Sequence, residues 1–280
     1  MQIGITTFPT DYSISATRLA RAVEDRGFDS LWVAEHTHIP ASRRTPYAWG
    51  DELPSIYWES YEPFTFLAQA AAVTESLKVG TAVCVVPEHH PLALAKRAAS
   101  LDSLSGGRFL FGVGAGWNEE ELENHGVAFK DRWKIVREHV LAMKACWTQK
   151  DGEYHGDFVD FEPVWVEPKP KSDPLPIYLG AESKWSFDRV AEYADGWLPS
   201  VAPELGGMIS NLKEACEARG RDIAEIDISA MGETPTQEEL AELKAMGVNR
   251  LILGLSTLDE SGSLHELDQQ AQIVEWARVL

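Results

Sequence analysis

Short apolar runs and amphipathic stretches alternate along the whole chain. The amphipathic stretches repeat apolar residues at the spacing of one helix face, as at Ala16, Leu19, Ala20 and Val23. Several of them are followed by a glycine that suits the left-handed position after a helix, namely Gly27, Gly106 and Gly247. The apolar runs that come next are continuous, which is typical of parallel strands buried on both faces. The pattern predicts repeated helix-to-strand units around a parallel sheet.

Eight apolar runs have the length of strands, at 3–7, 30–34, 79–85, 109–113, 177–179, 196–199, 226–230 and 251–253. Eight strands separated by helices favour a closed (β/α)8 TIM barrel over an open sheet. The chain of 280 residues is long enough for one such barrel, so a single domain over 1–280 is expected.

Two connections are longer than a plain barrel needs. The loop 36–62 follows the second strand, which places it at the catalytic end of a barrel, where it could act as a lid. It carries two arginines and several aromatic residues: Arg43, Arg44, Tyr47, Trp49, Tyr57, Trp58 and Tyr61. The segment 151–176 contains several prolines and is expected to form a hairpin or an extended excursion before the fifth strand.

Candidate acid–base residues follow the second strand directly. Glu35, His36 and His38 lie where the side chains at strand ends converge on one pocket in a barrel. A histidine beside a carboxylate is a common proton donor or acceptor near neutral pH. The third run is apolar from Thr81 to Pro87, up to the same rim, and this suits a flat ring system better than a sugar.

A glycine-rich turn follows the fourth strand. Gly112, Gly114 and Gly116 lead into an acidic stretch that suits the first turn of a new helix. Such a junction offers free backbone N–H groups to an anion, so a phosphate-binding turn is expected, with tight strand-to-helix packing as the alternative. The dinucleotide fingerprint is absent, because Trp117 stands where its third glycine belongs. The segment Gly180–Ser183 is a second turn of this kind, and a barrel would bring both to the same end.

Composition limits the partners of the chain. With 25 Lys+Arg against 44 Asp+Glu, the net charge of −19 disfavours nucleic acid and anionic membranes. The three cysteines lack metal-ligand spacing and suggest free thiols in a reducing compartment. The chain runs into a strand from its first residues, so a cytoplasmic location without a signal peptide is expected. No metal is expected either, since the histidines and glutamates after strands form no H-E-x-x-H or comparable pattern.

Longer motifs resemble the bacterial luciferase-like superfamily, and within it the oxidoreductases of actinobacterial type that depend on the deazaflavin coenzyme F420. These motifs are 35–40, 80–87 with Pro91 onward, 101–117 and 195–197, and the resemblance covers nearly the whole chain. It implies a (β/α)8 barrel, commonly a homodimer, that binds a flavin or deazaflavin at the C-terminal rim and acts on a small molecule.

The resemblance also implies roles for particular residues. Glu35 and His36 match an acid–histidine pair beside the reactive ring. Ala82–Val83, next to Thr81, matches the place of a non-prolyl cis peptide against that ring. Two further segments match those near the cofactor phosphate, and they comprise Gly114, Ala115, Gly116 and Trp117, and Gly180, Ala181, Glu182 and Ser183.

The function expected from the resemblance is hydride transfer between F420 and a small organic substrate. His36 would supply or remove a proton, with Glu35 orienting it or contacting the ring. The sugar-phosphate dehydrogenase branch has a glutamate where Trp117 stands, so a bulkier, more apolar substrate is expected. Arg43 and Arg44 are candidates for the cofactor's anionic tail or a substrate carboxylate, the alternative being a solvated pair. The substrate side of the loop would then comprise His38, Arg43, Arg44, Trp58 and Tyr61.

Three other functions remain open at this point. The nearest is an FMN-dependent monooxygenase of the same superfamily, which would use reduced flavin and oxygen. A non-catalytic flavoprotein or cofactor carrier could use the same barrel, although it would need no proton donor. A metal-dependent barrel hydrolase is the third, and the missing ligand pattern disfavours it.

Overall fold

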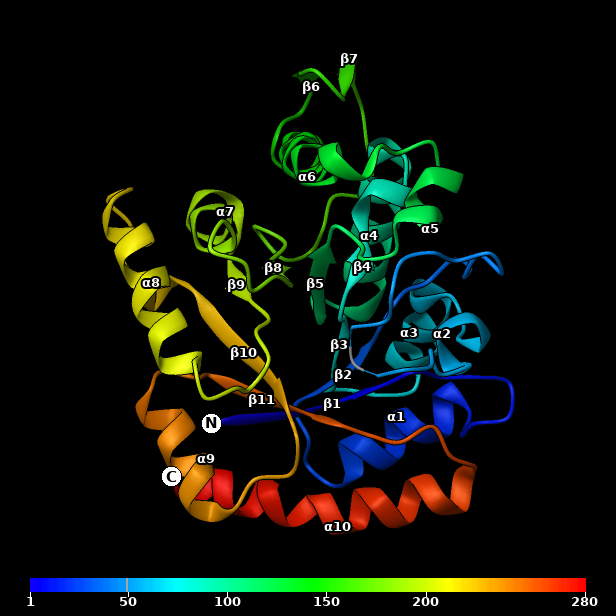
Figure 1. Ribbon diagram of the computed structural model, residues 1–280, viewed down its shortest axis with the longest axis vertical. Coiled ribbons are helices and arrows are strands. Elements are labelled where there is room, and N and C mark those ends of the chain that lie inside the picture. The colour runs from blue at the N-terminus through cyan, green and yellow to red at the C-terminus, as the bar shows by residue number, and fades with distance from the viewer. Residues whose placement is uncertain (49) are drawn as a thin grey trace.

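Parallel strands close into a barrel that helices surround (Figure 1). The structure is a computed structural model that describes residues 1–48 and 50–280, so Trp49 lies outside the described residues. Within these ranges the strands are β1 (Gln2–Thr7), β2 (Ser30–Val33), β3 (Lys78–Thr81), β4 (Cys84–Val85), β5 (Phe109–Gly114), β8 (Ile177–Leu179), β9 (Gly196–Trp197), β10 (Asp227–Gly232) and β11 (Arg250–Gly254).

The strand order confirms the predicted TIM barrel. Neighbouring strands run β3-β2-β1-β11-β10-β9-β8-β5, and pairing of β3 with β5 closes the circle. Each apolar run predicted as a strand contains one, and the third contains two, because β4 continues beyond β3 and also pairs with β5. The peptide bond between Ala82 and Val83, which separates β3 from β4, is cis.

The surrounding helices begin and end where the sequence signals them. They are α1 (Ala16–Asp25), α2 (Ile56–Glu59), α3 (Pro63–Ala72), α4 (Pro91–Ser105), α5 (Glu119–Asn124), α6 (Arg132–Thr148), α7 (Ser186–Tyr193), α8 (Leu205–Glu217), α9 (Gln237–Ala245) and α10 (Glu260–Val279), with 3-10 turns η1 (Val86–Glu88), η2 (Phe129–Asp131) and η3 (Ile223–Glu225). Gly27, Gly106 and Gly247 have φ values of 78°, 78° and 98°, which confirms their predicted left-handed conformation after a helix.

The barrel strands are buried on both faces, as continuous apolar runs require. Trp32, Phe109, Phe111 and Trp197 are among the largest fully buried side chains. Packing across the strands is close at Gly112, where an added Cβ atom would lie 1.8 Å from the carbonyl oxygen of Thr81. The three cysteines are free and buried, as the sequence suggested. In the described part of the chain, no helix is long and apolar enough to cross a bilayer.

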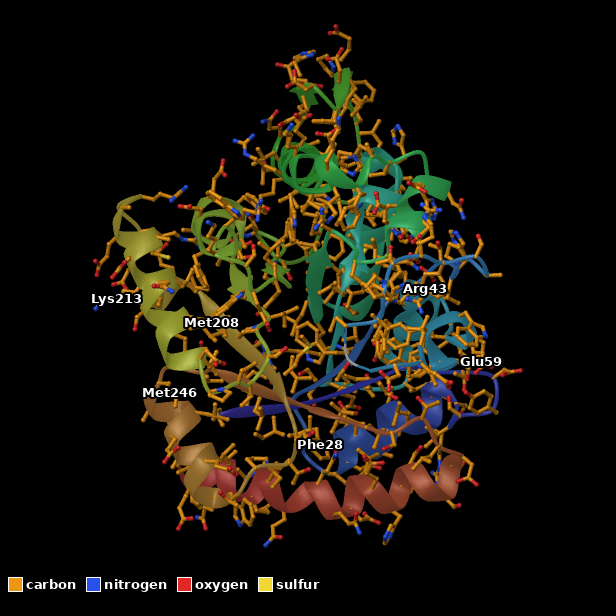
Figure 2. All side chains as sticks on the ribbon, in the orientation of Figure 1. Phe28, Arg43, Glu59, Met208, Lys213 and Met246 are labelled. Carbon is orange, nitrogen blue, oxygen red and sulfur yellow. The ribbon has the colours of Figure 1, made fainter. Side chains whose placement is uncertain are left out.

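Of the two long connections, the one before β8 takes a form that the sequence predicted, and the lid role of the loop after β2 stays a prediction. The segment before β8 forms an antiparallel hairpin of β6 (Gly152–His155) and β7 (Asp160–Val164), which projects beyond α6 at the top of Figure 1. The loop after β2 lies on the flank of the barrel opposite α8, as the labelled Arg43 and Lys213 show (Figure 2). This loop is held to α5, since Glu120 accepts hydrogen bonds from the backbone N–H groups of Arg44 and Thr45 at 2.6 and 3.1 Å.

Candidate active site

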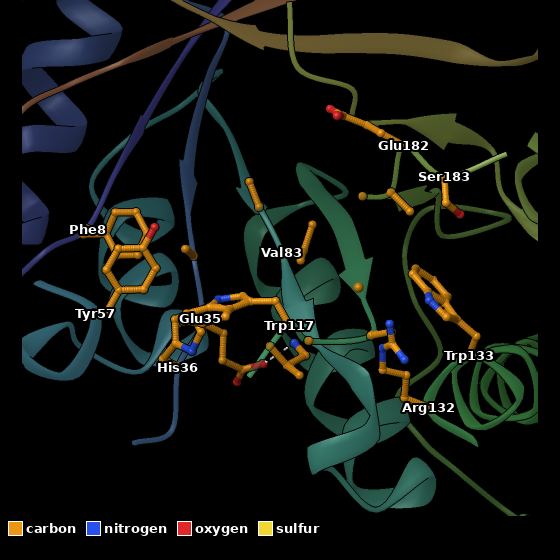
Figure 3. Close-up of a pocket in the computed structure, with 18 residues that line it drawn as sticks. Phe8, Glu35, His36, Tyr57, Val83, Trp117, Arg132, Trp133, Glu182 and Ser183 are labelled. Atoms are coloured by element: carbon orange, nitrogen blue, oxygen red, sulfur yellow. Dashed lines mark hydrogen bonds between the residues drawn. The ribbon is translucent and has the colours of Figure 1, made fainter. Parts of the chain in front are cut away.

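A cavity of about 410 Å³ opens at the C-terminal ends of the barrel strands. Its walls come from the segments after β1, β2, β3, β5 and β8, together with the start of α6. Figure 3 shows His36, Tyr57 and Phe8 on one side, Val83 in the middle, and Arg132 and Trp133 on the other. The cavity therefore lies where a barrel places its active site.

The middle of the cavity is formed by Ala82 and Val83, on the cis peptide between β3 and β4. Val83 fits between two glycines of neighbouring loops. A Cβ atom added to Gly114 would lie 2.5 Å from one methyl group of Val83, and one added to Gly180 would lie 2.6 Å from the other. These glycines allow three loops to meet around one apolar side chain, which gives the cavity an apolar floor.

His36 is paired with a carboxylate that the sequence did not indicate. Its Nδ1 lies 2.8 Å from Oε2 of Glu121 in α5, and both side chains are almost fully buried. The indole N–H of Trp117 points to His36 Nε2 at 3.4 Å. Because an indole N–H can only donate, Nε2 accepts and Nδ1 carries the hydrogen toward Glu121. The pair holds one imidazole tautomer with Nε2 at the cavity.

The sequence predicted that Glu35 either orients His36 or contacts the ring. The prediction that it orients His36 is wrong. Glu35 lines the cavity, but both of its oxygens are engaged elsewhere: Oε2 accepts from the backbone N–H of Val85 at 2.7 Å, and Oε1 lies 3.0 Å from His89 Nε2. Burial favours a higher pKa for Glu35, but the hydrogen bonds from His89, Cys84 and Val85 outweigh it and lower that pKa. Glu35 thus fixes the strand segment beneath the cavity.

Glu35, Cys84 and His89 also bring one potential metal-ligand atom each within 4.8 Å of one another. Hydrogen bonding accounts for this proximity, since the carboxylate already joins His89 to the backbone of Val85. Burial, together with the charge of Glu35, holds the pKa of the Cys84 thiol well above its usual range. We therefore describe this group as a hydrogen-bonded cluster around a protonated core thiol.

Aromatic side chains form the cavity wall near His36. Phe8 and Tyr57 pack at 4.8 Å between ring centroids, and the Tyr57 and His36 rings lie 5.2 Å apart. Trp117 meets His36 edge-on at 5.9 Å. Burial, with a hydrogen bond to Tyr47, raises the pKa of Tyr57 well above its usual value, so its hydroxyl stays neutral. This wall favours an apolar ligand group.

The opposite wall is cationic. Arg132 lines the cavity with its guanidinium 3.6 Å from the ring centroid of Phe129, and its Nε is buried without a hydrogen-bond partner. Arg189 stacks on Trp133 at 4.6 Å and has a buried Nη1 that likewise lacks a partner. Burial, followed by the charge of Arg189, lowers the pKa of Arg132. Arg132 is therefore a partly desolvated cation on the cavity wall with an unused donor, and it suits an anionic group.

Most residues predicted to bind the cofactor lie on the cavity. They are Ala82, Val83, Gly114, Ala115, Gly116, Trp117, Gly180, Ala181, Glu182 and Ser183. Thr81 is an exception, because it is fully buried and its hydroxyl donates to the carbonyl of Gly112 at 2.7 Å. The glycine turn does lead into a helix, α5, but glutamates fill its first turn, so an anion is better placed beside Arg132.

The residues predicted on the substrate side of the loop are absent from the cavity wall, so far as residues 1–48 and 50–280 are concerned. His38 bonds to Thr37 and Asn124, and Trp58 and Tyr61 are about half exposed. Arg44 pairs with Glu120 and Glu123, each at 3.2 Å, and therefore anchors the loop to α5. Arg43 lies 5.8 Å from the Trp117 ring, behind the wall.

Sequence reasoning missed Glu121, Arg132 and Trp133, which lie beyond the strand ends. The acidic run at the start of α5 and the clustered basic and aromatic residues at the start of α6 were visible as signals. Neither run alone shows which of its side chains faces the cavity.

A barrel with a histidine–carboxylate pair, an apolar floor and a cationic wall at its catalytic end defines an enzyme site for a flat ring with an anionic tail. The family model described as luciferase-like monooxygenase matches residues 8–277, and the chain belongs to that family. An uncharacterized protein of Mycobacterium tuberculosis is 37% identical over 260 residues, covering 91% of this chain and 92% of its own.

Solved structures share the fold. Monooxygenase RslO1 from Streptomyces bottropensis superposes with a TM-score of 0.79 at 20% identity, covering 97% of this chain and 98% of its own. An F420-dependent secondary alcohol dehydrogenase in complex with an F420–acetone adduct gives 0.78 at 17% identity, covering 98% of each chain. The chain is thus an enzyme of the luciferase-like oxidoreductase and monooxygenase family.

Proposed function

We propose that the chain is an F420-dependent oxidoreductase, which transfers a hydride between coenzyme F420 and a small, fairly apolar organic substrate. The observation that carries this proposal is the arrangement of one cavity: His36 at one end, the apolar floor of Ala82 and Val83, and the unpartnered Nε of Arg132 at the other end. A flat ring would rest on the floor between a proton-handling group and a cation.

The residues present fit such a cofactor. Val83 would support the ring together with Gly114 and Gly180, which pack against it. These two glycines carry no side chain that would obstruct the ring. Arg132, with Ser183 and the backbone of the segment after β8, would hold the phosphate. When bound, the deazaflavin supplies or accepts a hydride at carbon and exchanges two electrons at once.

Proton transfer falls to His36. In substrate oxidation, a hydride leaves the substrate carbon and the hydroxyl proton passes to Nε2 of His36, which gives up its hydrogen bond from the Trp117 indole to accept it. Glu121 stabilises the charge that forms on the imidazole, because it already accepts the Nδ1 hydrogen at 2.8 Å. In substrate reduction, the same atoms return the proton to oxygen. The aromatic wall of Phe8, Tyr57 and Trp117 would hold the apolar part of the substrate.

An FMN-dependent monooxygenase is the alternative, and the family description favours it, since that family is named for luciferase-like monooxygenases. Reduced FMN would use the same floor and the same cation. The homodimer and the cytoplasmic location expected from the sequence stay predictions.

The test is a titration of purified apoprotein with F420 and with FMN, followed by cofactor fluorescence at fixed salt. We expect tight binding of F420 alone, then F420 reduction or oxidation with small alcohols, ketones or other apolar compounds. Preference for FMN together with oxygen consumption during turnover would replace the proposal by the monooxygenase. Binding of neither cofactor would contradict both.

A further inference from the structure

A second carboxyl group lies behind the histidine–carboxylate pair of the active site. Glu88, at the end of η1, has a side chain with 0% exposure, and neither of its oxygens has a hydrogen-bond partner. A carboxylate buried in this way is costly unless it is paired or carries a proton. The proposed function leaves Glu88 without a role, since it is not among the residues that line the cavity.

Glu88 lies between the active site and a histidine at the surface. On the inner side, Glu121 is close enough for its charge to act on Glu88, and Glu121 in turn contacts His36 Nδ1 at 2.8 Å. On the outer side, His125 Nε2 is 3.6 Å from Glu88 Oε2, and the His125 side chain is 27% exposed. The side chains of His36, Glu121, Glu88 and His125 therefore follow one another in a row from the cavity to the surface. A protonated Glu88 can donate to Glu121, and the 3.6 Å between Glu88 and His125 has to shorten for a proton to pass.

The electrostatic surroundings keep a proton on Glu88. Burial, followed by the charges of Glu121 and Glu35, raises the pKa of Glu88 to about 9. The titratable groups that act on Glu88 are Glu35, Cys84, Glu121 and His125; beyond them, Arg97 acts on Cys84, and His38 and His89 act on His125. Near neutral pH, Glu88 is thus a neutral acid.

The outer end of the row is organised to exchange protons. Thr37 Oγ1 lies 2.8 Å from His125 Nε2 and 2.9 Å from His38 Nδ1, and His38 Nε2 contacts Asn124. Burial, followed by the charge of His38, lowers the pKa of His125. A partly exposed imidazole that gives up its proton easily can pass one between bulk water and a buried acid.

We propose that Glu88 is the proton carrier of this enzyme, and that it connects the Glu121–His36 pair to solvent through His125. In substrate oxidation, a proton arriving at His36 Nε2 is matched by one leaving Nδ1 for Glu121. Glu88 takes up that proton as it releases its own to His125, and His125 releases it to water. Glu121, Glu88 and His125 end with the protons they had before, whereas the hydrogen of His36 has moved from Nδ1 to Nε2. Reduction of a substrate takes that hydrogen from Nε2, runs the row in reverse and restores the starting state.

This inference rests on the proposed function, because that function provides the reaction in which the protons move. The protonation of Glu88 itself does not depend on the proposed function. The first experiment therefore uses apoprotein. Infrared difference spectra between pH 7 and pH 10 should show one protonated carboxyl group that loses its proton near pH 9. The signal should vanish in Glu88→Gln, which keeps the size and neutrality of the acid, and persist in Glu162→Gln, the same change on the exposed hairpin. An unaltered signal in Glu88→Gln, or none in the wild type, would overturn the proposal.

The second experiment follows proton release with a pH indicator during a single turnover of the F420-loaded enzyme. Glu88→Gln should slow proton release and turnover at least about tenfold, less than the 10²–10⁴ expected for loss of the acid–base group itself, while F420 affinity stays unchanged. Added imidazole should restore the rate, because a small carrier replaces the row. His125→Gln should give a milder loss with the same rescue.

The outcomes separate this inference from the proposed function. Unchanged proton release in Glu88→Gln, or a loss that imidazole does not restore, would mean that Glu88 is only structural and would overturn the proposal. If neither F420 nor FMN binds, the proposed function fails, and the infrared result alone decides whether Glu88 carries a proton.

Discussion

Arg132 offers the sharpest test of how the pocket holds an anionic cofactor. We consider Arg132→Met, which removes the charge and the unpartnered Nε donor, together with the contacts of the guanidinium to the Phe129 ring and carbonyl. A hydrogen bond between charged partners contributes about 1.5–3 kcal/mol, which corresponds to about 10- to 150-fold in the dissociation constant. F420 should bind more weakly by that factor, and the dependence of its affinity on salt should also become weaker.

Arg132→Met should weaken cofactor binding without lowering the stability of the apoprotein. Burial and the charge of Arg189 both disfavour the charged form of Arg132, so its replacement relieves an unfavourable interaction in the folded state. We expect a melting temperature no lower than that of the wild type without ligand, and a smaller rise on adding F420.

Arg137→Met is the matched control, since Arg137 lies on the same helix but pairs with Glu192 at 2.6 Å on the surface. It should leave the F420 dissociation constant unchanged. The reasoning would be refuted if Arg132→Met bound F420 as tightly as the wild type, or if both variants lost affinity equally.

Three further changes test other parts of the structure. His36→Asn should lower turnover by about 10²–10⁴ while F420 fluorescence titrations stay unchanged, and full turnover would disprove its proton-transfer role. Hydrogen bonds from Thr45 outweigh burial and lower the pKa of Glu120 to about 2, below its ordinary 4.5, so its stabilisation is complete above pH 4.5 and is lost as the pH falls toward 2. Urea unfolding should therefore show Glu120→Gln less stable than the wild type at pH 7, with a smaller difference at pH 3; an equal difference at both pH values would contradict this. Gly112→Ala should cost about 3 kcal/mol or more of unfolding free energy, because its Cβ would lie 1.8 Å from a carbonyl oxygen, whereas Gly254→Ala meets open space and serves as the control.

The barrel could be predicted because its signals are local. Each strand is a continuous apolar run, and glycines such as Gly27 and Gly247 mark the preceding helix ends within a few residues. Strand ends in turn place His36, Val83 and Gly180 at one rim, since parallel strands of a barrel all point the same way. This part of the site follows from topology alone.

The remaining part of the site depends on contacts between distant segments. His36 and Glu121 are 85 residues apart, and no sequence pattern ties a histidine after β2 to one glutamate among several in α5. Glu35 was the nearer partner in the chain, but its side chain turns beneath the rim toward His89. The prediction that Thr81 binds the cofactor failed for a similar reason, because the Thr81 hydroxyl donates to the carbonyl of Gly112.

The meeting of Val83 with Gly114 and Gly180 has a consequence for engineering the enzyme. Each methyl group of Val83 fills the space that a side chain at Gly114 or Gly180 would need. A larger residue at any of these three positions therefore displaces the other two. Libraries aimed at new substrates should leave the three positions fixed. Diversity belongs instead at Phe8 and Tyr57, whose rings border the cavity, whereas Trp117 should also be kept because its indole contacts His36.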